Sequence, residues 1–325
     1  MIDERTYWIA LSMVKGIGAA RFRVLLDAFG SAQKAWEAAP GSLNNLGLGQ
    51  KVVDAFLKVR QSTDLSRIIP DLEKEQVKTL TLLDETYPRR LRDLDQAPPV
   101  LYLRGDLLPE DEWAIGVVGT RRVTTYGHQI AEELGAFLAH NGITVVSGMA
   151  RGVDAIAHQS ALAAGGRSVA VLAHGLDIIY PPEHRDLAKE ISASGALVSD
   201  YALGTPPEAA NFPPRNRIIS GLSMAVVIIE AGEESGALIT AGFAAEQGRE
   251  VFALPGNINA PQSKGSNLLI QRGAHPLLKY EDLLQALDLQ MMGEYKTARV
   301  QLPSDATEAK LFELLGQEPM HVDEI

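Results

Sequence analysis

Ala-Ile-Gly-Val-Val-Gly-Thr-Arg, residues 114–121, is the stretch of this chain that decides its fold. An apolar run ends in a glycine, a hydroxyl and an arginine, and a helical pattern follows over residues 126–140. Glycine lets the backbone approach a ligand closely, free N–H groups at a helix start face it, and a guanidinium supplies positive charge. The stretch therefore predicts a strand, an anion-binding turn and a helix.

The chain repeats this arrangement. A second apolar run, residues 143–147, leads into Gly148-Met149-Ala150-Arg151-Gly152 and a helical pattern over 153–164. Further apolar runs cover residues 77–83, 100–103, 168–172, 196–199, 224–230 and 250–254, and a third clear helical pattern covers 238–247. Near-continuous apolar strands that alternate with helices predict an α/β fold, in which a doubly wound, mostly parallel sheet is covered on both faces.

Ligands of such sheets bind beyond the carboxyl ends of the strands, where both Gly/Arg turns lie. Arginine suits bidentate phosphate binding, and an exposed phenylalanine can stack on a base. The residues that we expect on this rim are Gly119, Thr120, Arg121, Arg122, Arg151, Arg185, Phe212, Arg215, Asn216, Arg217, Ser235 and Gly236. The residue types leave open whether the ligand is a nucleotide, a sugar phosphate or a polymer. Alternatively, each arginine is a solvated surface charge, Phe212 anchors the core, and Asp154 is a helix N-cap.

Residues 1–65 read as short helices that are interrupted by two Gly-x-Gly turns. Lys15-Gly16-Ile17-Gly18 forms the first turn, and Gly47-Leu48-Gly49 forms the second. Helix, Gly-apolar-Gly, helix is the helix-hairpin-helix pattern, whose backbone N–H groups face a DNA phosphate. Lys15, Gly16 and Gly18 are therefore candidates for a secondary DNA contact. The alternative is that both turns are ordinary helix ends, where glycine is common.

Composition excludes several kinds of function. The chain has no cysteine, no apolar run long enough to cross a bilayer, and an acidic start, Met-Ile-Asp-Glu, so we expect a cytoplasmic protein with no membrane contact. The net charge is −11, and the tail from residue 281 carries ten acidic and three basic residues, so we expect it to avoid DNA. His174 and His184 match no metal-ligand spacing, which predicts no metal site. A P-loop, the three-glycine dinucleotide fingerprint and a Gly-x-Ser-x-Gly elbow are all absent, which argues against a bound cofactor.

Many separate motifs, in order, resemble those of the bacterial DNA-processing protein A family (DprA, also called Smf). They include Val-Val-Gly-Thr-Arg at 117–121, Val-Ser-Gly-Met-Ala-Arg-Gly-Val-Asp at 146–154, and Gly-Leu-Asp-Ile-Ile-Tyr-Pro-Pro-Glu at 175–183. Asn-Phe-Pro-Pro-Arg-Asn-Arg at 211–217, Glu-Ala-Gly-Glu-Glu-Ser-Gly-Ala at 230–237 and Gly-Ser-Asn-Leu-Leu-Ile at 265–270 continue the match. The resemblance covers about the whole chain.

This resemblance implies three parts. They are a helical helix-hairpin-helix or SAM-like domain at 1–65, an extended Rossmann-like domain at 66–290, and the start of an incomplete winged-helix domain at 300–325. It also implies a protein without catalytic activity or cofactor that binds single-stranded DNA and loads the recombinase RecA during natural transformation. Arg121 matches the family's DNA-binding loop arginine, and a basic loop supplies Arg215 and Arg217. His184 stands where the family often has lysine or asparagine.

A competing resemblance is to the nucleoside-monophosphate phosphoribohydrolases, which carry Pro-Gly-Gly-x-Gly-Thr-x-x-Glu. The corresponding turn, residues 230–240, lacks the double glycine and the glutamate at that spacing, which favours a binding protein.

The DprA resemblance also implies a homodimer. Residues 275–280 read as a final edge strand, and apolar residues follow on one helix face. We expect the dimer interface at Leu277, Leu278, Leu283 and Leu287. The alternative is that these leucines pack on the sheet.

Overall fold

The computed structural model describes residues 2–287. Among these residues, short helices come first: α1 (Glu4–Ser12), α2 (Ala19–Phe29), α3 (Ala32–Glu37), α4 (Pro40–Asn44), α5 (Gln50–Ser62) and α6 (Leu65–Lys74). Local signals set their ends. Asp3 caps α1 by accepting a hydrogen bond from Thr6 N at 2.9 Å, and Gly30 closes α2 in the left-handed conformation, with φ 80°.

A nine-stranded sheet follows in the described part of the chain, in the order β1-β2-β6-β5-β4-β3-β7-β8-β9. Its strands are β1 (Lys78–Thr81), β2 (Val100–Gly105), β3 (Ala114–Gly119), β4 (Thr144–Ser147), β5 (Ser168–Leu172), β6 (Ala196–Ser199), β7 (Ala225–Ile229), β8 (Glu250–Ala253) and β9 (His275–Pro276). The pairs β1–β2 and β2–β6 are antiparallel, and all the others are parallel. Strands β1 and β2 thus extend a parallel, Rossmann-like core at one edge.

The chain winds outward in both directions from β3. It runs through β4, β5 and β6 to one side and then returns to β7 on the other side of β3. In the register, Ile115 of β3 is aligned with Val145 of β4 and with Ala225 of β7. This topology confirms the predicted doubly wound α/β fold. The helices of this part are α7 (Arg89–Arg92), α8 (Thr125–His140), α9 (Val153–Ala163), α10 (Arg185–Ser194), α11 (Phe212–Leu222), α12 (Gly236–Glu246) and α13 (Lys264–Gln271). Helix α14 (Glu281–Ala286) belongs to a separate unit that begins at Glu281.

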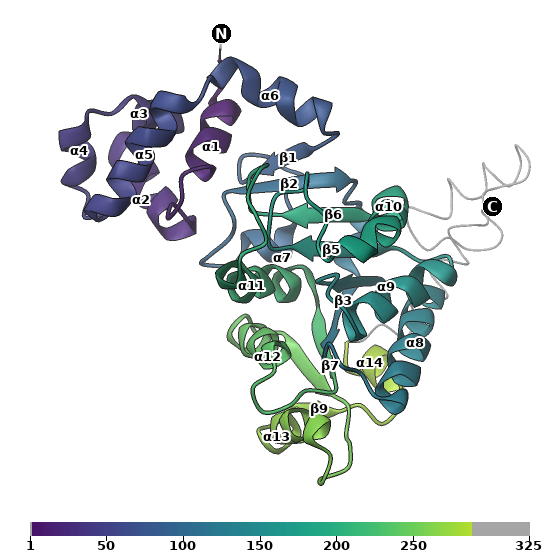
Figure 1. The fold of residues 1–325 in the computed structure, drawn as a ribbon. Coiled ribbons are helices and arrows are strands. Elements are labelled where there is room, and N and C mark those ends of the chain that lie inside the picture. The colour runs from purple at the N-terminus through teal and green to yellow at the C-terminus, as the bar shows by residue number, and fades with distance from the viewer. Residues whose placement is uncertain (1, 288–325) are drawn as a thin grey trace, which may run out of the picture. The chain divides into compact units, whose positions relative to one another are not determined.

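Helices cover both faces of the sheet (Figure 1). On one face α9 contacts both α8 and α10, and on the other α11 contacts both α7 and α12. Successive side chains of a strand point to opposite faces of the sheet. Val118, Val146 and Ile228 point to the same face and belong to the core beneath α11 and α12. Nearly every residue of β3 to β7 is buried, which explains the near-continuous apolar runs of the sequence.

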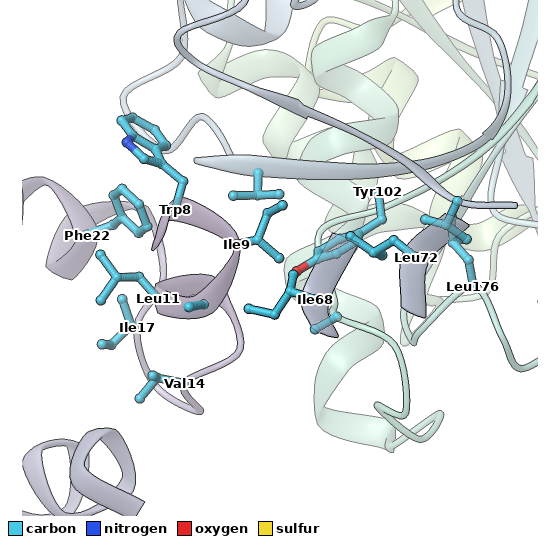
Figure 2. Close-up of a cluster of buried hydrophobic side chains, with 14 of the residues drawn as sticks. Trp8, Ile9, Leu11, Val14, Ile17, Phe22, Ile68, Leu72, Tyr102 and Leu176 are labelled. Atoms are coloured by element: carbon cyan, nitrogen blue, oxygen red, sulfur yellow. The ribbon is translucent and has the colours of Figure 1, made fainter. Parts of the chain in front are cut away.

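The N-terminal helices share a hydrophobic core with the β2 end of the sheet. Figure 2 shows Trp8, Leu11 and Phe22 on the helical side of this cluster and Tyr102 on the sheet side. The Tyr102 hydroxyl is buried and lies 2.8 Å from Ser12 Oγ, which satisfies both polar groups at the junction. The helices are thereby fixed against the sheet within the unit of residues 1–280.

The predicted strands and helices that fall on described residues are observed at their predicted places, with two changes. One lies at the sheet edge, and the other at residues 212–217, which were expected to form a loop but begin α11. Residues 275–280 were expected to form a strand, but only His275–Pro276 pairs with β8. Leu277 N donates the last ladder bond, to Ala253 O at 2.9 Å, and β8 itself ends at Ala253, so the later residues have no strand to pair with. The predicted winged-helix segment at 300–325 lies outside the described residues. Within residues 2–287 no helix is long and apolar enough to cross a membrane.

A buried histidine gives the fold a specific pH dependence. His158 of α9 is fully buried, with Nδ1 2.6 Å from Ser168 Oγ, and that hydroxyl donates to Val145 O at 3.1 Å. Burial, helped by the nearby charges of His184 and Arg215, lowers the pKa of His158 to about 3. Since the unfolded chain takes up this proton near pH ~6.5, the unfolded state binds more protons between these two pKa values.

We therefore expect His158 to make the free energy of unfolding fall by about 1.4 kcal/mol per pH unit as the pH drops below ~6.5. His158→Gln should remove this slope, whatever its effect on stability at neutral pH. Urea denaturation at a series of pH values from 5 to 7.5 measures it, with the exposed His140→Gln as the control. Parallel stability profiles for wild type and His158→Gln would contradict the assignment.

Candidate nucleic-acid interface

A pocket of about 590 Å³ opens at the point where the sheet's winding reverses. We call it the switch-point pocket. It is lined by the turn after β3 (119–122), by the start of α11 (212–216), and by the loop before α12 together with the first turn of α12 (232–240). Connections that leave neighbouring strands on opposite faces open a crevice between them, which is where doubly wound sheets bind ligands. Ala150 of the turn after β4 and Asp154 of α9 also line it, so the two Gly/Arg turns of the sequence meet at this pocket.

Close backbone packing forms the floor of this pocket. A Cβ on Gly119 would collide with the carbonyl oxygen of Ile229 on the neighbouring strand, so glycine is required there. Thr120 N donates to Glu230 O at 2.8 Å. The Glu230 carboxylate is buried and accepts hydrogen bonds from the backbone N and the hydroxyl of Thr124, the N-cap of α8. The end of β7 thus fixes the turn after β3 and the start of α8.

Phe212 lies between two cations at the pocket wall. Its ring centroid is 5.8 Å from Arg121 Cζ and 5.9 Å from Arg215 Cζ, both within cation–π range. The ring is half-buried, and Tyr180 lies 6.0 Å from it, centroid to centroid, with 38% of its own surface exposed. The site therefore presents a pair of partly exposed aromatic rings next to positive charge. Base stacking on single strands uses the same combination.

Arg215 is the most unusual residue of the site, because it is only 4% exposed. Its Nη1 donates to the Val171 carbonyl, and its Nε has no hydrogen-bond partner among the described residues. Burial lowers the pKa of this guanidinium to about 10, so it is still charged at neutral pH. The charges of Asp154 and Asp200 offset part of this cation, and an anion in the adjoining pocket would compensate the remainder.

Gly148 makes room for that cation. A Cβ there would collide with the Arg215 guanidinium, so the turn after β4 must pass without a side chain. Asp154 is not the N-cap of α9; that position belongs to Gly152. Instead the Asp154 carboxylate is buried and accepts from the N–H groups of Gly148 and Ala150, at 3.1 and 3.3 Å. Burial raises its pKa, and the Arg215 charge opposes that rise.

Nine of the twelve expected rim residues line the switch-point pocket. They are Gly119, Thr120, Arg121, Arg122, Phe212, Arg215, Asn216, Ser235 and Gly236. Arg121 and Arg122 are exposed. Ser235 caps α12 by accepting from Ala237 N at 3.3 Å. The structure therefore brings these nine expected residues together in one pocket.

The other three arginines lie elsewhere. Arg151 pairs with Glu183, and Arg185 is exposed at the start of α10. Arg217 faces away and pairs with Asp200 at 2.7 Å, with 12% of its side chain exposed. The segment around it was expected to be a loop, but Phe212 onward is the first turn of α11. Helical spacing turns Arg215 and Arg217 to different sides.

Tyr180 was not among the expected site residues. It contacts both Phe212 and His174, and its ring is exposed at the site. It belongs to the Tyr-Pro-Pro-Glu motif after β5, so the sequence held a signal for it. His174 is buried, and burial lowers its pKa. Nδ1 of His184 lies 2.9 Å from Met149 O. Residues 2–287 hold no group of three side chains suited to a metal ion.

The helix-hairpin-helix candidates lie apart from this pocket. Lys15, Gly16 and Gly18 connect α1 to α2 and line a second pocket of about 570 Å³. The side chain of Lys15 is 88% exposed and pairs with Glu208 at 3.3 Å.

The leucines expected at a dimer interface differ in exposure. Leu277 and Leu283 are buried within the chain, Leu287 is half-buried, and Leu278 is 72% exposed. Only Leu278 among the four presents most of its surface to a partner.

Comparisons with known proteins agree with this architecture. Residues 78–288 match the model of the DNA recombination-mediator protein A family, and residues 2–55 match that of the DprA-like N-terminal HHH domain. Protein Smf of Synechocystis sp. is 40% identical over 290 residues, which are 88% of this chain and 73% of that protein. The structure of DNA processing protein A from Streptococcus pneumoniae superposes with a TM-score of 0.72 at 31% identity, over 87% of this chain and 96% of that one. A structure from Helicobacter pylori is described as giving insights into the single-stranded DNA binding mode of DNA processing protein A. It superposes with a TM-score of 0.59 at 33% identity, over 65% of this chain and 95% of that one.

The chain belongs to the DNA recombination-mediator protein A family.

Proposed function

We propose that this protein binds single-stranded DNA in the switch-point pocket, without sequence preference. The observation that carries the proposal is the charge of Arg215, buried under the pocket with an unpartnered Nε, beside exposed Arg121 and the ring of Phe212. Phosphates would compensate the cations, and bases would stack on Phe212 and Tyr180. The Helicobacter pylori relative, described as a single-stranded DNA binder, supports the same ligand.

We further propose that the bound strand is DNA taken up during natural transformation, which the protein protects in the cytoplasm and delivers to RecA. The family's name, recombination mediator, supports this step. A mediator must hold the strand without cutting it, and the proposed binding groups are cations and rings rather than an acid–base pair.

The alternative function, a phosphoribohydrolase, is less well supported. Its motif is absent, and the carboxylate of Glu230 is occupied by two hydrogen bonds from Thr124. Thr240 is buried in α12. The Glu230 carboxylate is therefore engaged in holding the start of α8 rather than free to protonate a nucleotide.

Arg121→Ala tests the binding proposal directly. Loss of one phosphate contact should weaken binding equally for oligonucleotides of different sequence and lower the slope of log K against log salt by about 0.7. Fluorescence anisotropy at several salt concentrations measures both. Arg67→Ala, which removes an exposed arginine on α6, is the matched control. An unchanged salt slope in Arg121→Ala would count against the proposal.

Gly148→Ala tests the role of the buried cation. The added methyl should displace the Arg215 guanidinium, costing about 1–3 kcal/mol of stability and weakening DNA binding. Gly242→Ala on α12 is the control, because its Cβ meets no atom within 4 Å. Urea denaturation and anisotropy are read together. Reduced stability with wild-type affinity would mean that Arg215 serves the fold alone.

We also propose that the protein acts as a homodimer through the sheet edge at β9 and the exposed Leu278. A short exposed edge next to an apolar side chain is a self-pairing surface. Leu278→Arg should convert the dimer to a monomer in light scattering at tens of micromolar. Leu83→Arg, at another exposed leucine after β1, should leave the mass unchanged. A monomeric wild type, or a dimeric Leu278→Arg, would exclude this interface.

A further inference from the structure

The second pocket lies between the N-terminal helices and the sheet. We call it the hairpin pocket. The α1–α2 turn (12–19), the loop after β6 (200–206) and the first turn of α11 line it, together with Glu208. The loop after β6 leaves a carboxyl strand end, so the hairpin pocket opens on the same edge of the sheet as the switch-point pocket.

One turn of helix separates the two pockets. Phe212, Pro213, Arg215 and Asn216 line the switch-point pocket, whereas Asn211, Pro214 and Arg217 line the hairpin pocket. The first turn of α11 is therefore a shared wall. A polymer that leaves one pocket need cross only this turn to enter the other.

The hairpin pocket repeats the chemistry of the first. It is lined by two cations, Lys15 and Arg217, and by the half-buried ring of Tyr201. Arg217 Nη2 pairs with Asp200, but its Nη1 has no hydrogen-bond partner among the described residues. Asp200 offsets the charge of Arg217, which leaves Lys15 as the cation that can respond to a ligand.

Glu208 is the obstacle to an anion in this pocket. Its carboxylate lies 3.3 Å from Lys15 Nζ, and the two side chains are 49% and 88% exposed. Ion pairs this exposed are weak and screened by salt. A phosphate, with more charge and more acceptor oxygens, can take the place of Glu208 at Lys15.

We propose that the hairpin pocket is a second subsite for the same single strand, in which Lys15 exchanges Glu208 for a backbone phosphate. The inference rests on the proposed binding of DNA in the switch-point pocket. The strand crosses the first turn of α11, and the helix-hairpin-helix turn holds its continuation. Glu208 acts as an internal competitor, so it sets how strongly long strands are preferred over short ones.

Two opposite substitutions test the exchange. Lys15→Ala should weaken binding of long oligonucleotides several-fold and lower their salt slope by about 0.7, while short ones bind as to wild type. Glu208→Gln should strengthen binding of long oligonucleotides and leave short ones unchanged. Lys51→Ala is the matched control, because Lys51 follows the other Gly-x-Gly turn and does not line the hairpin pocket.

The measurement is fluorescence anisotropy with homopolymers from about 4 to about 16 nucleotides, the range that single-strand grooves span. A length threshold that Lys15→Ala removes and Glu208→Gln sharpens supports the subsite. Wild-type affinity of Lys15→Ala at every length, or equal losses in Lys15→Ala and Lys51→Ala, overturns it. Failure of the binding proposal itself looks different, since Arg121→Ala would then leave short and long oligonucleotides equally unaffected.

Discussion

The rest of the structure depends on the parallel pairing of β3 with β7. These strands are neighbours in the sheet but far apart in the sequence, and the chain leaves them toward opposite faces. The crevice between the connection after β3 and the connection after β7 is therefore lined largely by the residues of these two connections. Gly119 allows the backbones to touch, and Glu230 ties the end of β7 to the start of α8. The pocket is therefore a consequence of topology, and its residues are those that the topology leaves at the rim.

A buried cation gives this pocket its chemical character. Arg215 lies beneath the opening of the pocket and donates a hydrogen bond to the Val171 carbonyl. Gly148 and Asp154 determine the course of the turn after β4 around it. Desolvation disfavours its charge but does not remove it, since its pKa remains near 10. The fold accepts the cost of an incompletely satisfied charge at a place where an anionic ligand would satisfy it. Arg121 and Phe212 then add an exposed cation and a ring at the entrance.

The net charge of the chain does not reveal the cations and aromatic rings that line the two pockets. A net charge of −11 argues against nucleic acid as a ligand, yet the cations and rings collect on one edge of the sheet. The N-terminal helices extend that edge, because their shared core with β2 sets the α1–α2 turn beside the loop after β6. Position on the surface, rather than total charge, determines what an acidic protein of this kind can bind.

The sequence by itself determined the fold class, the strand order of appearance and most of the rim. Apolar runs that end in Gly and Arg reveal buried parallel strands, because such strands are covered on both faces. The sequence could not show which arginines face the pocket and which form ion pairs elsewhere. Whether Arg121 is exposed, Arg215 buried or Arg217 paired with Asp200 depends on helical phase at α11 and on partners 17 to about 90 positions away in the chain. The motif at residues 180–183 likewise does not show that Tyr180 lies next to Phe212, which only the tertiary structure reveals. Local pattern fixes elements, whereas tertiary packing decides which polar groups lose their water and which keep it.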